Sequence, residues 1–315
     1  MRLFWEQVAL PVQALIGNAD VIFSPANVAV LGAPVPQVLM FQNLVPFAPE
    51  VIRRRRESAK FRFFVLRAFG ILSSRLARRV VFIANAQREA ILPWLGVAAS
   101  KTATVYLGHD PAFSPRAIAA APGLLRRLGL TQPYLLSVSQ VYHYKNLVEL
   151  VRAFARATTR LPSDVKLALA GAEHERRYAA LVRRTIRDAG LGDRVKVLGH
   201  VPYHDLPPLY AAASQFVFPS TCESFPNILI EALASGVPVL SSRCCSMPEL
   251  AGDAAVYFDP FDPEEMGRQI VTVWEDAALA RSLSEKGIAR AERYSWDRTA
   301  VKILELLETA AFRAT

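Results

Sequence analysis

Residues 218–239, which read FPSTCESFPNILIEALASGVPV, constrain the fold more than any other part of the chain. The apolar run QFVF ends at Phe218, and the short polar stretch after it predicts a loop. Pro226 suits the first turn of a helix, and ILIEALAS is helical in character as far as Gly236. A strand, a short loop and a helix start therefore meet here. In an open parallel sheet such a junction binds phosphate, because free backbone N–H groups and the positive end of the helix dipole face outward.

Two glutamates are separated by seven residues in this segment. Glu223 lies in the expected loop, and Glu231 lies one turn inside the expected helix. Carboxylates beside a phosphate must serve another part of the ligand. Glu231 could accept hydrogen bonds from ribose hydroxyls, and Glu223 could reach a sugar. Two glutamates at this spacing are also common on a solvated helix face, but the flanking FPN and ASGVPV favour a binding site.

The rest of the chain alternates short β-rich runs with helical stretches, which is the rhythm of a parallel sheet. At 315 residues and 52% hydrophobic content, the chain is long enough for two α/β domains. We expect a boundary within residues 111–132 and helices over residues 146–159 and 176–189. The expected strands cover residues 21–23, 38–41, 80–84 and 104–106 in the first half, and 134–138, 166–170, 195–198, 215–218, 237–241 and 256–258 in the second.

Residues 134–296 resemble the retaining GT-B glycosyltransferases of the glycosyltransferase group 1 family (glycosyltransferase family 4). The resemblance runs through LLSVSQVYHYKNLVELVRAFA, LALAGAEHE, VKVLGHVPYHDLPPLYAAASQFVFPS and PELAGDAAVYFDP, and it includes the Glu-x7-Glu pair. It implies two Rossmann-like domains facing a cleft. Residues 1–115 would form the acceptor-side domain, and residues 116–315 would form the nucleotide-sugar domain with a C-terminal helical tail. Members of the family usually have further strand–helix units before the part that residues 5–25 resemble, so we expect an incomplete N-terminal domain.

The resemblance also assigns roles around the donor phosphates. Lys145, between the strand YLLSVS and a helix, would neutralise a diphosphate through charge-assisted hydrogen bonds of about 1.5–3 kcal/mol each. The alternative is a solvated lysine at a helix start. Family members usually carry an arginine five or six residues earlier, where this chain has Ser139 and Gln140. The segment whose backbone N–H groups would meet the diphosphate consists of Ser224, Phe225, Pro226 and Asn227.

Other parts of the pocket are assigned by the same resemblance. The loop GHVPYHDL, which includes Gly199 and Val201, resembles the segment against which the nucleotide base packs. Gly108 resembles the turn after the last strand of the first domain, where glycine lets the chain pass close to a ligand. Many relatives place a histidine near the donor sugar, where this chain has Gln42 and Asn43. An amide can bind a sugar hydroxyl but cannot act as an acid or base near neutral pH.

The function implied is transfer of a hexose from a nucleotide diphosphate sugar to a glycan or lipid-linked saccharide, with retention of configuration. Glu223 and Lys145 would act at the reacting centre, and the KN after the turn favours a mannosyl donor. No metal site and no cofactor are expected, because the five histidines do not cluster at ligand spacing and lysine, amides and a helix start can replace a cation. Two alternatives remain: a catalytically impaired or truncated nucleotide-sugar-binding protein, and another nucleotide-sugar enzyme of this fold, such as an epimerase or a phosphorylase.

Basic charge is concentrated in the first third of the chain. Residues 1–120 contain 14 Lys or Arg against 6 acids. The densest run, from Arg53 to Arg79, has apolar residues at helical spacing, namely Phe61, Phe64, Val65, Ala68, Leu72 and Leu76. This helix would either lie on an anionic membrane surface or turn its apolar stripe to the core. No nucleic-acid-reading module accompanies the charge.

The three cysteines form no disulfide framework, and no basic-then-apolar signal opens the chain. Both observations predict a cytoplasmic protein that is, at most, peripheral to the inner face of the membrane. The uncharged residues 21–49 resemble a membrane span at first sight, but five prolines exclude one continuous helix.

Overall fold

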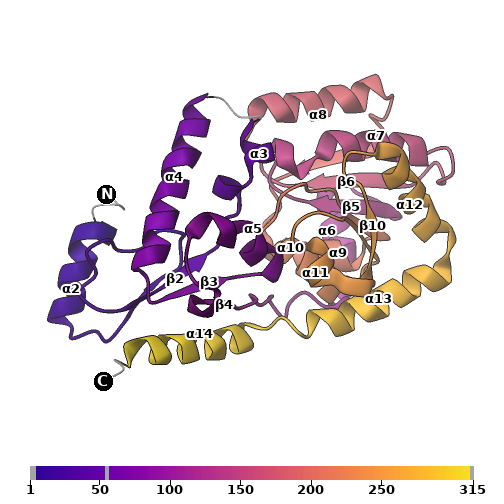
Figure 1. Ribbon diagram of the computed structural model, residues 1–315. Coiled ribbons are helices and arrows are strands. Elements are labelled where there is room, and N and C mark those ends of the chain that lie inside the picture. The colour runs from indigo at the N-terminus through magenta and orange to yellow at the C-terminus, as the bar shows by residue number, and fades with distance from the viewer. Residues whose placement is uncertain (1–4, 54–56, 313–315) are drawn as a thin grey trace. The chain divides into compact units, whose positions relative to one another are not determined.

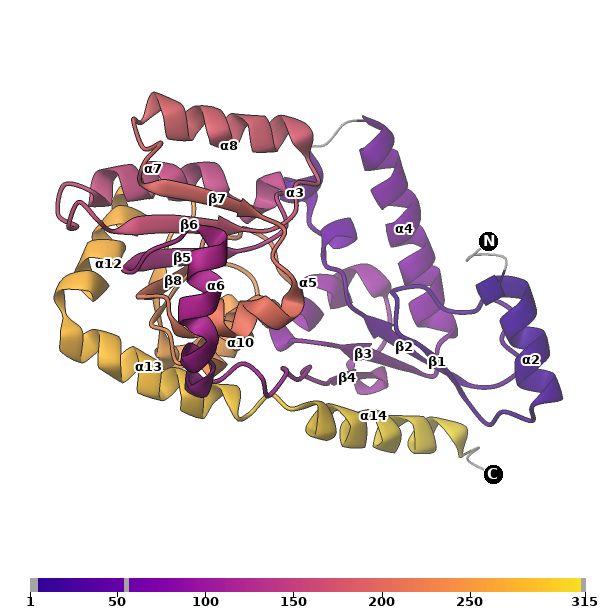
Figure 2. The ribbon, with the colours of Figure 1, turned by 180° about the vertical axis from the view of Figure 1, so that it is seen from behind.

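The computed structural model describes residues 5–53 and 57–312, which form two compact units, each built on a parallel sheet (Figures 1 and 2). Unit 1 comprises Met1–Gly108, Cys222–Phe225 and Trp296–Thr315. Unit 2 comprises His109–Thr221 and Pro226–Ser295. The sheets are parallel throughout, and this confirms the α/β class that the alternation of strands and helices predicted.

Unit 1 contains a four-stranded sheet in the order β1-β2-β3-β4. Helices α4 and α5 lie on one side of this sheet, and α14 runs along the other (Figures 1 and 2). The strands are β1 (Ile22–Ser24), β2 (Gln37–Phe41), β3 (Arg79–Phe82) and β4 (Thr102–Thr104). The helices are η1 (Trp5–Ala9), α2 (Leu10–Ile16), η2 (Val45–Phe47), α3 (Pro49–Arg53), α4 (Glu57–Leu76), α5 (Asn85–Leu95), η3 (Ala99–Lys101) and α14 (Trp296–Ala311).

The two central strands of unit 1 are apolar on both faces because helices cover both. All five residues of β2 are buried, as are the last three of β3. Phe41 pairs with Phe82 in register, and their rings stack with centroids 5.4 Å apart. The sheet thus holds the loop after β2, which contains Gln42 and Asn43, at its carboxyl edge.

Unit 2 contains a six-stranded sheet in the order β10-β9-β8-β5-β6-β7. One face is covered by α7, α8 and α12, and the other by α6, α9, α10 and α13 (Figures 1 and 2). The strands are β5 (Tyr134–Val138), β6 (Lys166–Ala170), β7 (Val195–Gly199), β8 (Gln215–Phe218), β9 (Val239–Ser242) and β10 (Ala255–Phe258). The helices are η4 (Pro115–Ala120), α6 (Ala121–Leu128), η5 (His143–Lys145), α7 (Leu147–Ala157), α8 (Arg176–Asp188), η6 (Tyr203–Asp205), α9 (Leu206–Ala211), α10 (Asn227–Ala234), α11 (Met247–Ala251), η7 (Gly252–Ala254), α12 (Pro263–Glu275) and α13 (Ala277–Ala291).

The strand order of unit 2 has a switch point between β5 and β8. From β5 the chain winds outward through β6 and β7, and it then returns to place β8 on the other side of β5. Connections that leave β5 and β8 therefore diverge and leave a crevice at the carboxyl ends of these strands. In open α/β sheets this is where ligands bind.

The ten strands expected from the sequence are present, shifted by two residues or fewer at each end. One detail of the expected helix after β8 is different. Pro226 is not in its first turn but directly precedes α10, with φ −77° and ψ 93°, and the helix ends at Ala234 rather than near Gly236. Gly236 has a φ of +73° and belongs to the turn that leads to β9. No helix within the described ranges is long and apolar enough to cross a bilayer.

Candidate functional site

The loops that follow β5 and β8 are tied together at the switch point of unit 2. The carbonyl oxygen of Tyr144 accepts hydrogen bonds from the Thr221 amide at 2.8 Å, from Thr221 Oγ1 at 3.1 Å and from Ser220 Oγ at 3.2 Å. Ser242 Oγ in turn donates to the Ser220 carbonyl at 2.5 Å. The β5 loop that carries Lys145 is thus fixed to the start of the β8 loop that leads to Glu223.

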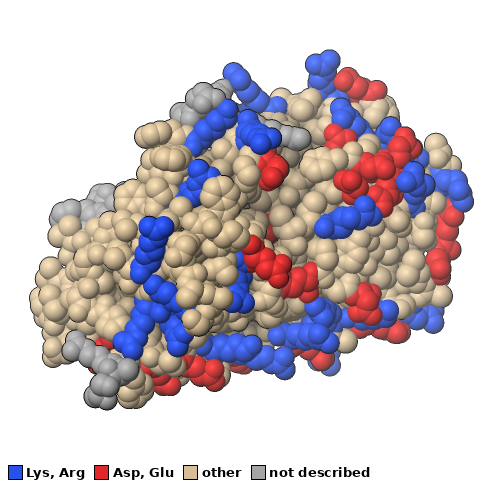
Figure 3. All heavy atoms as spheres, viewed as in Figure 1, with Lys and Arg blue, Asp and Glu red and all other residues tan. Residues whose placement is uncertain are grey.

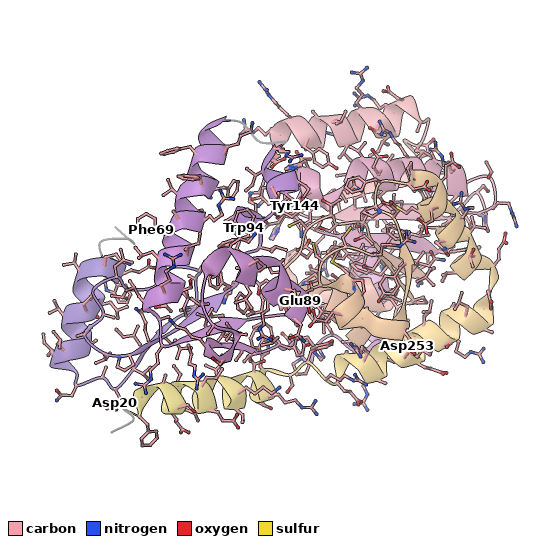
Figure 4. All side chains as sticks on the ribbon, viewed as in Figure 1. Asp20, Phe69, Glu89, Trp94, Tyr144 and Asp253 are labelled. Atoms are coloured by element: carbon pink, nitrogen blue, oxygen red, sulfur yellow. The ribbon has the colours of Figure 1, made fainter. Side chains whose placement is uncertain are left out.

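Lys145 is half-buried at the end of η5, directly before the residue that opens α7. Its Nζ lies 5.3 Å from the centroid of the Tyr144 ring and 5.6 Å from that of Phe218, the last residue of β8 (Tyr144 is labelled in Figure 4). Asn146 then adopts a left-handed conformation with φ 59°, and its side-chain amide donates to the Pro260 carbonyl. The ammonium group therefore lies at the carboxyl end of β8, where the switch point predicts an anionic ligand.

Glu231 is a buried carboxyl group with spare hydrogen-bonding capacity. It lies one turn inside α10 and is only 5% exposed. Tyr203 Oη donates to Glu231 Oε1 at 3.4 Å. The other carboxyl oxygen, Oε2, is buried and makes no hydrogen bond of normal geometry, and the same is true of the Tyr210 hydroxyl, although this hydroxyl lies close enough to lower the pKa of Glu231. A buried carboxyl group without its full set of donors costs free energy, which a ligand hydroxyl could recover.

The same burial changes the acidity of the group. Burial raises the pKa of Glu231 to about 7, and the hydrogen bond from Tyr203 opposes this rise. The nearby Asp110 carboxylate also raises this pKa. In the unliganded protein the carboxyl group therefore gains or loses its proton near neutral pH. The neighbouring Tyr203 has its own pKa raised to about 12, mainly by burial, and stays a donor.

A cavity of about 240 Å³ opens beside this carboxyl group, at the carboxyl ends of β5, β6 and β7. Tyr203 lines it, and Ile228, one turn before Glu231 on α10, lines it too. Its wall includes residues of the loop GHVPYHDL, among them Val201, and Gly199 adjoins this wall with a φ of +68°. The remaining lining residues are Val138, Ser139, Gln140, Ala170, Gly171, Ala172, His200 and Leu206. A ring-sized, mainly apolar recess with a few polar groups suits a flat heterocycle.

Gly171 lines this cavity, and the structure leaves no room for a side chain at this position. A Cβ at this position would lie 1.7 Å from the Ser139 carbonyl oxygen, and its φ of +148° is one that side chains rarely allow. The Gly171 amide donates to the Gly199 carbonyl at 2.7 Å. The loops after β5, β6 and β7 therefore meet at a single glycine.

Residues 222–225 of the β8 loop group with unit 1. Ser224 Oγ accepts a hydrogen bond from the Leu44 amide at 2.8 Å, directly after Gln42 and Asn43. Phe225 is buried, and its ring lies 6.4 Å from that of Tyr106. Glu223, directly before Ser224, is half-buried. Asn227, two residues later, is exposed as the first residue of α10.

Gln42 and Asn43 are held by Asn27, a residue that the sequence did not single out. Asn27 Oδ1 accepts from the Gln42 amide at 2.7 Å and from the Asn43 amide at 3.0 Å, while its Nδ2 donates to the Asn43 carbonyl at 2.8 Å. The side chain of Gln42 is exposed beyond this clamp. Gly108 is buried as the last residue before the chain enters unit 2.

Sequence reasoning also missed the partners of Glu231. Tyr203 lies after β7 and Tyr210 lies in α9, more than twenty residues before Glu231 in each case. Phe113 joins them, with its ring centroid 5.5 Å from Tyr203 and 5.6 Å from Tyr210. No spacing rule connects such positions, so only the fold reveals this aromatic enclosure. Within the described residues, no three His, Cys, Asp or Glu side chains are grouped as metal ligands.

Comparison with known families agrees with this geometry. The family model described as glycosyl transferases group 1 matches residues 126–290, just over half of the chain, and includes the loops after β5 and β8 and helix α10. The chain belongs to this family. Sequence comparison with curated members of known name supports the assignment. O-antigen chain mannosyltransferase B of Escherichia coli is 30% identical over 224 residues, which cover 70% of this chain and 58% of that protein.

Other relatives have different substrates in their names. Mannosylfructose-phosphate synthase of Agrobacterium fabrum is 29% identical over 210 residues, covering 63% of this chain and 45% of that one. The chain thus spans about half the length of the curated relatives that it matches. Among solved structures, Anabaena Alr3699/HepE in complex with UDP and glucose superposes with a TM-score of 0.77 at 24% identity, covering 94% of this chain and 80% of that one. The likeness confirms the GT-B fold that the sequence predicted.

Proposed function

We propose that the protein transfers a hexose from a nucleotide diphosphate sugar to a hydroxyl of a glycan or lipid-linked saccharide, with retention at the anomeric carbon. The observation that carries the proposal is the Glu231 carboxyl group, buried beside a cavity at the switch point with no hydrogen bond of normal geometry to Oε2. A ribose presents two adjacent hydroxyls, which are the donors that this oxygen lacks. The names of the related mannosyltransferases and synthases support the same reaction class.

The donor would bind through three contacts along unit 2. The base would occupy the cavity against Val201 and Gly199, and the ribose would meet Glu231. The diphosphate would be neutralised by Lys145 and the N-terminal end of α10, which carries a partial positive charge. As the bond to the anomeric carbon breaks, negative charge grows on the leaving diphosphate, and these fixed groups stabilise it.

Glu223 would hold the hexose, and Ser224, Phe225 and Pro226 would shape the loop around the phosphates. No enzymic nucleophile is required if the acceptor hydroxyl attacks the face that the diphosphate leaves and passes its proton to that phosphate. This course retains configuration. Gln42 and Asn43 would contribute hydrogen bonds to hydroxyls but no proton transfer. We assign no cofactor or metal ion to the reaction.

The donor sugar and base are separate questions. The mannosyltransferase names among the relatives support mannose, while the HepE complexes hold UDP, UDP with glucose, or UDP-glucose. Backbone atoms and the apolar wall form most of the recess, so base preference is open to direct measurement. The three cysteines are thiols, which supports a reducing cytoplasmic location.

The test begins with binding. Titration of the protein with UDP and GDP by calorimetry should identify one tight-binding nucleotide. Glu231→Ala should weaken it at least about ten-fold through loss of one charge-assisted hydrogen bond or more. Glu285→Ala, which removes an exposed glutamate on α13 of the same unit, should leave the affinity unchanged. Absence of binding by either nucleotide would contradict the proposal.

Transfer is then measured by mass spectrometry, with the matching nucleotide sugars and a membrane extract as acceptor and with donor hydrolysis as the control. A hexose added to an extract component supports the enzyme. The substitution of the expected histidine by Gln42 favours a second candidate, a nucleotide-sugar-binding protein without transferase activity. Tight nucleotide binding with no transfer from any donor would support that second function instead.

A further inference from the structure

Helix α4 contacts the sheet of unit 1 through its smallest residues. Gly70 lies so close that a Cβ there would be 3.3 Å from the Phe41 ring and 3.4 Å from the Phe47 ring. Ser73 Oγ accepts from the Ala29 amide at 3.0 Å, and Ser74 Oγ donates to the Ile71 carbonyl at 2.7 Å. Gly70, Ser73 and Ser74 are all buried. The inward face of this helix therefore comes close to the sheet at Gly70, and the large apolar residues Phe63 and Leu66 on the same side are half-buried.

Five large apolar side chains of α4 lie on its outward face. They recur along one side of the helix and are exposed by 42–70%: Phe61, Phe64, Phe69, Leu72 and Leu76. A helix of a soluble domain normally has the opposite arrangement, with its large apolar residues facing the core. Trp94 on the adjacent α5 is 42% exposed and extends this surface; Figure 4 labels it together with Phe69. We call these six residues the α4 apolar face.

From Lys60 onward, where the side chains of α4 are described, basic side chains border the α4 apolar face and the helix has no acidic residue; Glu57 opens the helix. Six Lys or Arg and no Asp or Glu occur from Lys60 to Arg79. The Arg67 guanidinium lies 4.8 Å from the centroid of the Trp94 ring and 5.9 Å from that of Phe64, so positive charge is held directly against the aromatic side chains. Figure 3 shows basic side chains among neutral surface over this part of unit 1.

We propose that the α4 apolar face docks on an anionic lipid bilayer. Phenylalanine, tryptophan and leucine would enter the boundary between headgroups and acyl chains while the arginines contact lipid phosphates. An interface with a protein partner is the rival, but a run of six cations without one acid matches a uniformly anionic surface. The sequence offered two outcomes for this stripe, a membrane surface or the core; in the structure Phe61, Phe64, Leu72 and Leu76 are exposed, and Val65 is half-buried. Arg54, Arg55 and Arg56 of the same basic run lie outside the described residues, and the proposal does not use them.

The test is co-sedimentation with vesicles of phosphatidylcholine alone and of phosphatidylcholine with phosphatidylglycerol. We expect the full chain to sediment with the anionic vesicles at 0.15 M salt and to be released at 1 M, where screening is strong. The triple variant Phe61→Ser, Phe69→Ser and Leu72→Ser should bind at least about ten-fold more weakly. Lys60→Gln with Arg62→Gln should cost about five-fold for each charge removed.

The matched control removes equally exposed apolar residues elsewhere in unit 1. Val301→Ser with Leu304→Ser, on α14, should leave vesicle binding unchanged. Circular dichroism and nucleotide affinity confirm that every variant is folded. As a second readout, brominated lipids should quench tryptophan fluorescence in the wild type and quench it less in Trp94→Phe.

Three results would overturn the proposal. The first is equal binding to neutral and anionic vesicles. The second is vesicle binding by the triple variant at the wild-type level. The third is concentration-dependent self-association that the triple variant abolishes in a chain that binds no vesicle, because this would assign the face to a second copy of the protein.

Discussion

At the scale of single residues, Glu231 shows how a site can be set for its ligand at a cost to stability. Its carboxyl group interacts with Tyr203 and Tyr210, whose rings pack on Phe113, while Oε2 and the Tyr210 hydroxyl make no hydrogen bond of normal geometry. Burial favours the protonated, neutral form of the Glu231 carboxyl group. Ribose hydroxyls, however, donate their hydrogen bonds best to the ionised carboxylate. A bound nucleotide would therefore stabilise the ionised carboxylate, and nucleotide affinity should rise as the pH increases through 7.

The pKa of Glu231 leads to a prediction about stability. The pKa of Glu231 is about 7 in the folded state, against an ordinary value of 4.5. The protonated carboxyl group therefore contributes to the free energy of unfolding fully below pH 4.5, and this contribution is lost as the pH rises through 7. Glu231→Gln is always neutral. Without nucleotide, the variant should be more stable than the wild type at pH 8 by up to about 3 kcal/mol, and this gain should shrink at pH 5. Urea denaturation of both proteins at the two pH values measures it; an identical difference at both would contradict the burial of this charge.

The two glutamates should separate by role. Glu231→Ala removes contacts to ribose that exist equally in ground and transition states, so donor KM should rise about ten-fold to several-hundred-fold. Glu223→Ala should instead lower kcat, because its proposed partner is the hexose, where charge develops. Titration with the bare nucleotide, which has a ribose but no hexose, distinguishes them. Equal weakening of nucleotide binding by both substitutions would refute the assignment.

At the scale of elements, the positions of the strands and helices could be predicted because they depend on local sequence pattern. The face that a helix turns to its sheet could not be predicted, because it depends on packing. The runs YLLSV and KLALA were predicted as strands because short apolar runs bounded by turns suit buried parallel strands. The stripe on α4 was predicted too, but periodicity does not say which face meets the sheet. The face of α4 that meets the sheet is the one with Gly70, because only a small residue allows the helix to lie so close to the Phe41 ring.

The same limit applies to the candidate site. Lys145, Glu223 and Glu231 were predicted as site residues because they lie in motifs that continue along the chain, and this assignment stays a prediction. Asn27, Tyr203 and Tyr210 were not, because each reaches its partner across a gap in sequence that only the fold closes. Their polar or aromatic character alone is compatible with many positions.

Gly171 provides a prediction at this scale. Gly171→Ala would force a Cβ into the Ser139 carbonyl and separate the loops after β5 and β6, so we expect a loss of about 2–4 kcal/mol in unfolding free energy. Gly190→Ala is the matched control, because Gly190 also has positive φ but has open space around it. It should cost only about 1–2 kcal/mol. Urea denaturation of both variants compares them, and equal losses would show that conformation, not the clash, dominates at Gly171.

At the scale of the whole molecule, each unit has its own sheet and its own core. The core of unit 2 draws on α7, α8, α12 and α13 and on strands from β5 to β10, all from within residues 109–295. Unit 1 is assembled from three separate stretches of chain and needs α14 from the C-terminal end. In the sequence, the nearly continuous unit 2 thus lies between the first and last parts of the discontinuous unit 1.

This arrangement predicts that residues 109–295 fold alone. The fragment keeps the six-stranded sheet, Lys145, Glu231 and the cavity, and it loses the unit 1 contacts of Ser224 and Phe225. Because the contacts proposed for base and ribose lie in unit 2, as do Lys145 and α10 for the diphosphate, the fragment should unfold cooperatively and bind the preferred nucleotide within about ten-fold of the full chain. That ratio allows up to about 1.4 kcal/mol for loss of order in the β8 loop. Glu231→Ala should weaken nucleotide binding equally in fragment and full chain. Denaturation followed by circular dichroism and nucleotide calorimetry provide the measurements; a folded fragment that binds no nucleotide would show that unit 1 completes the nucleotide site.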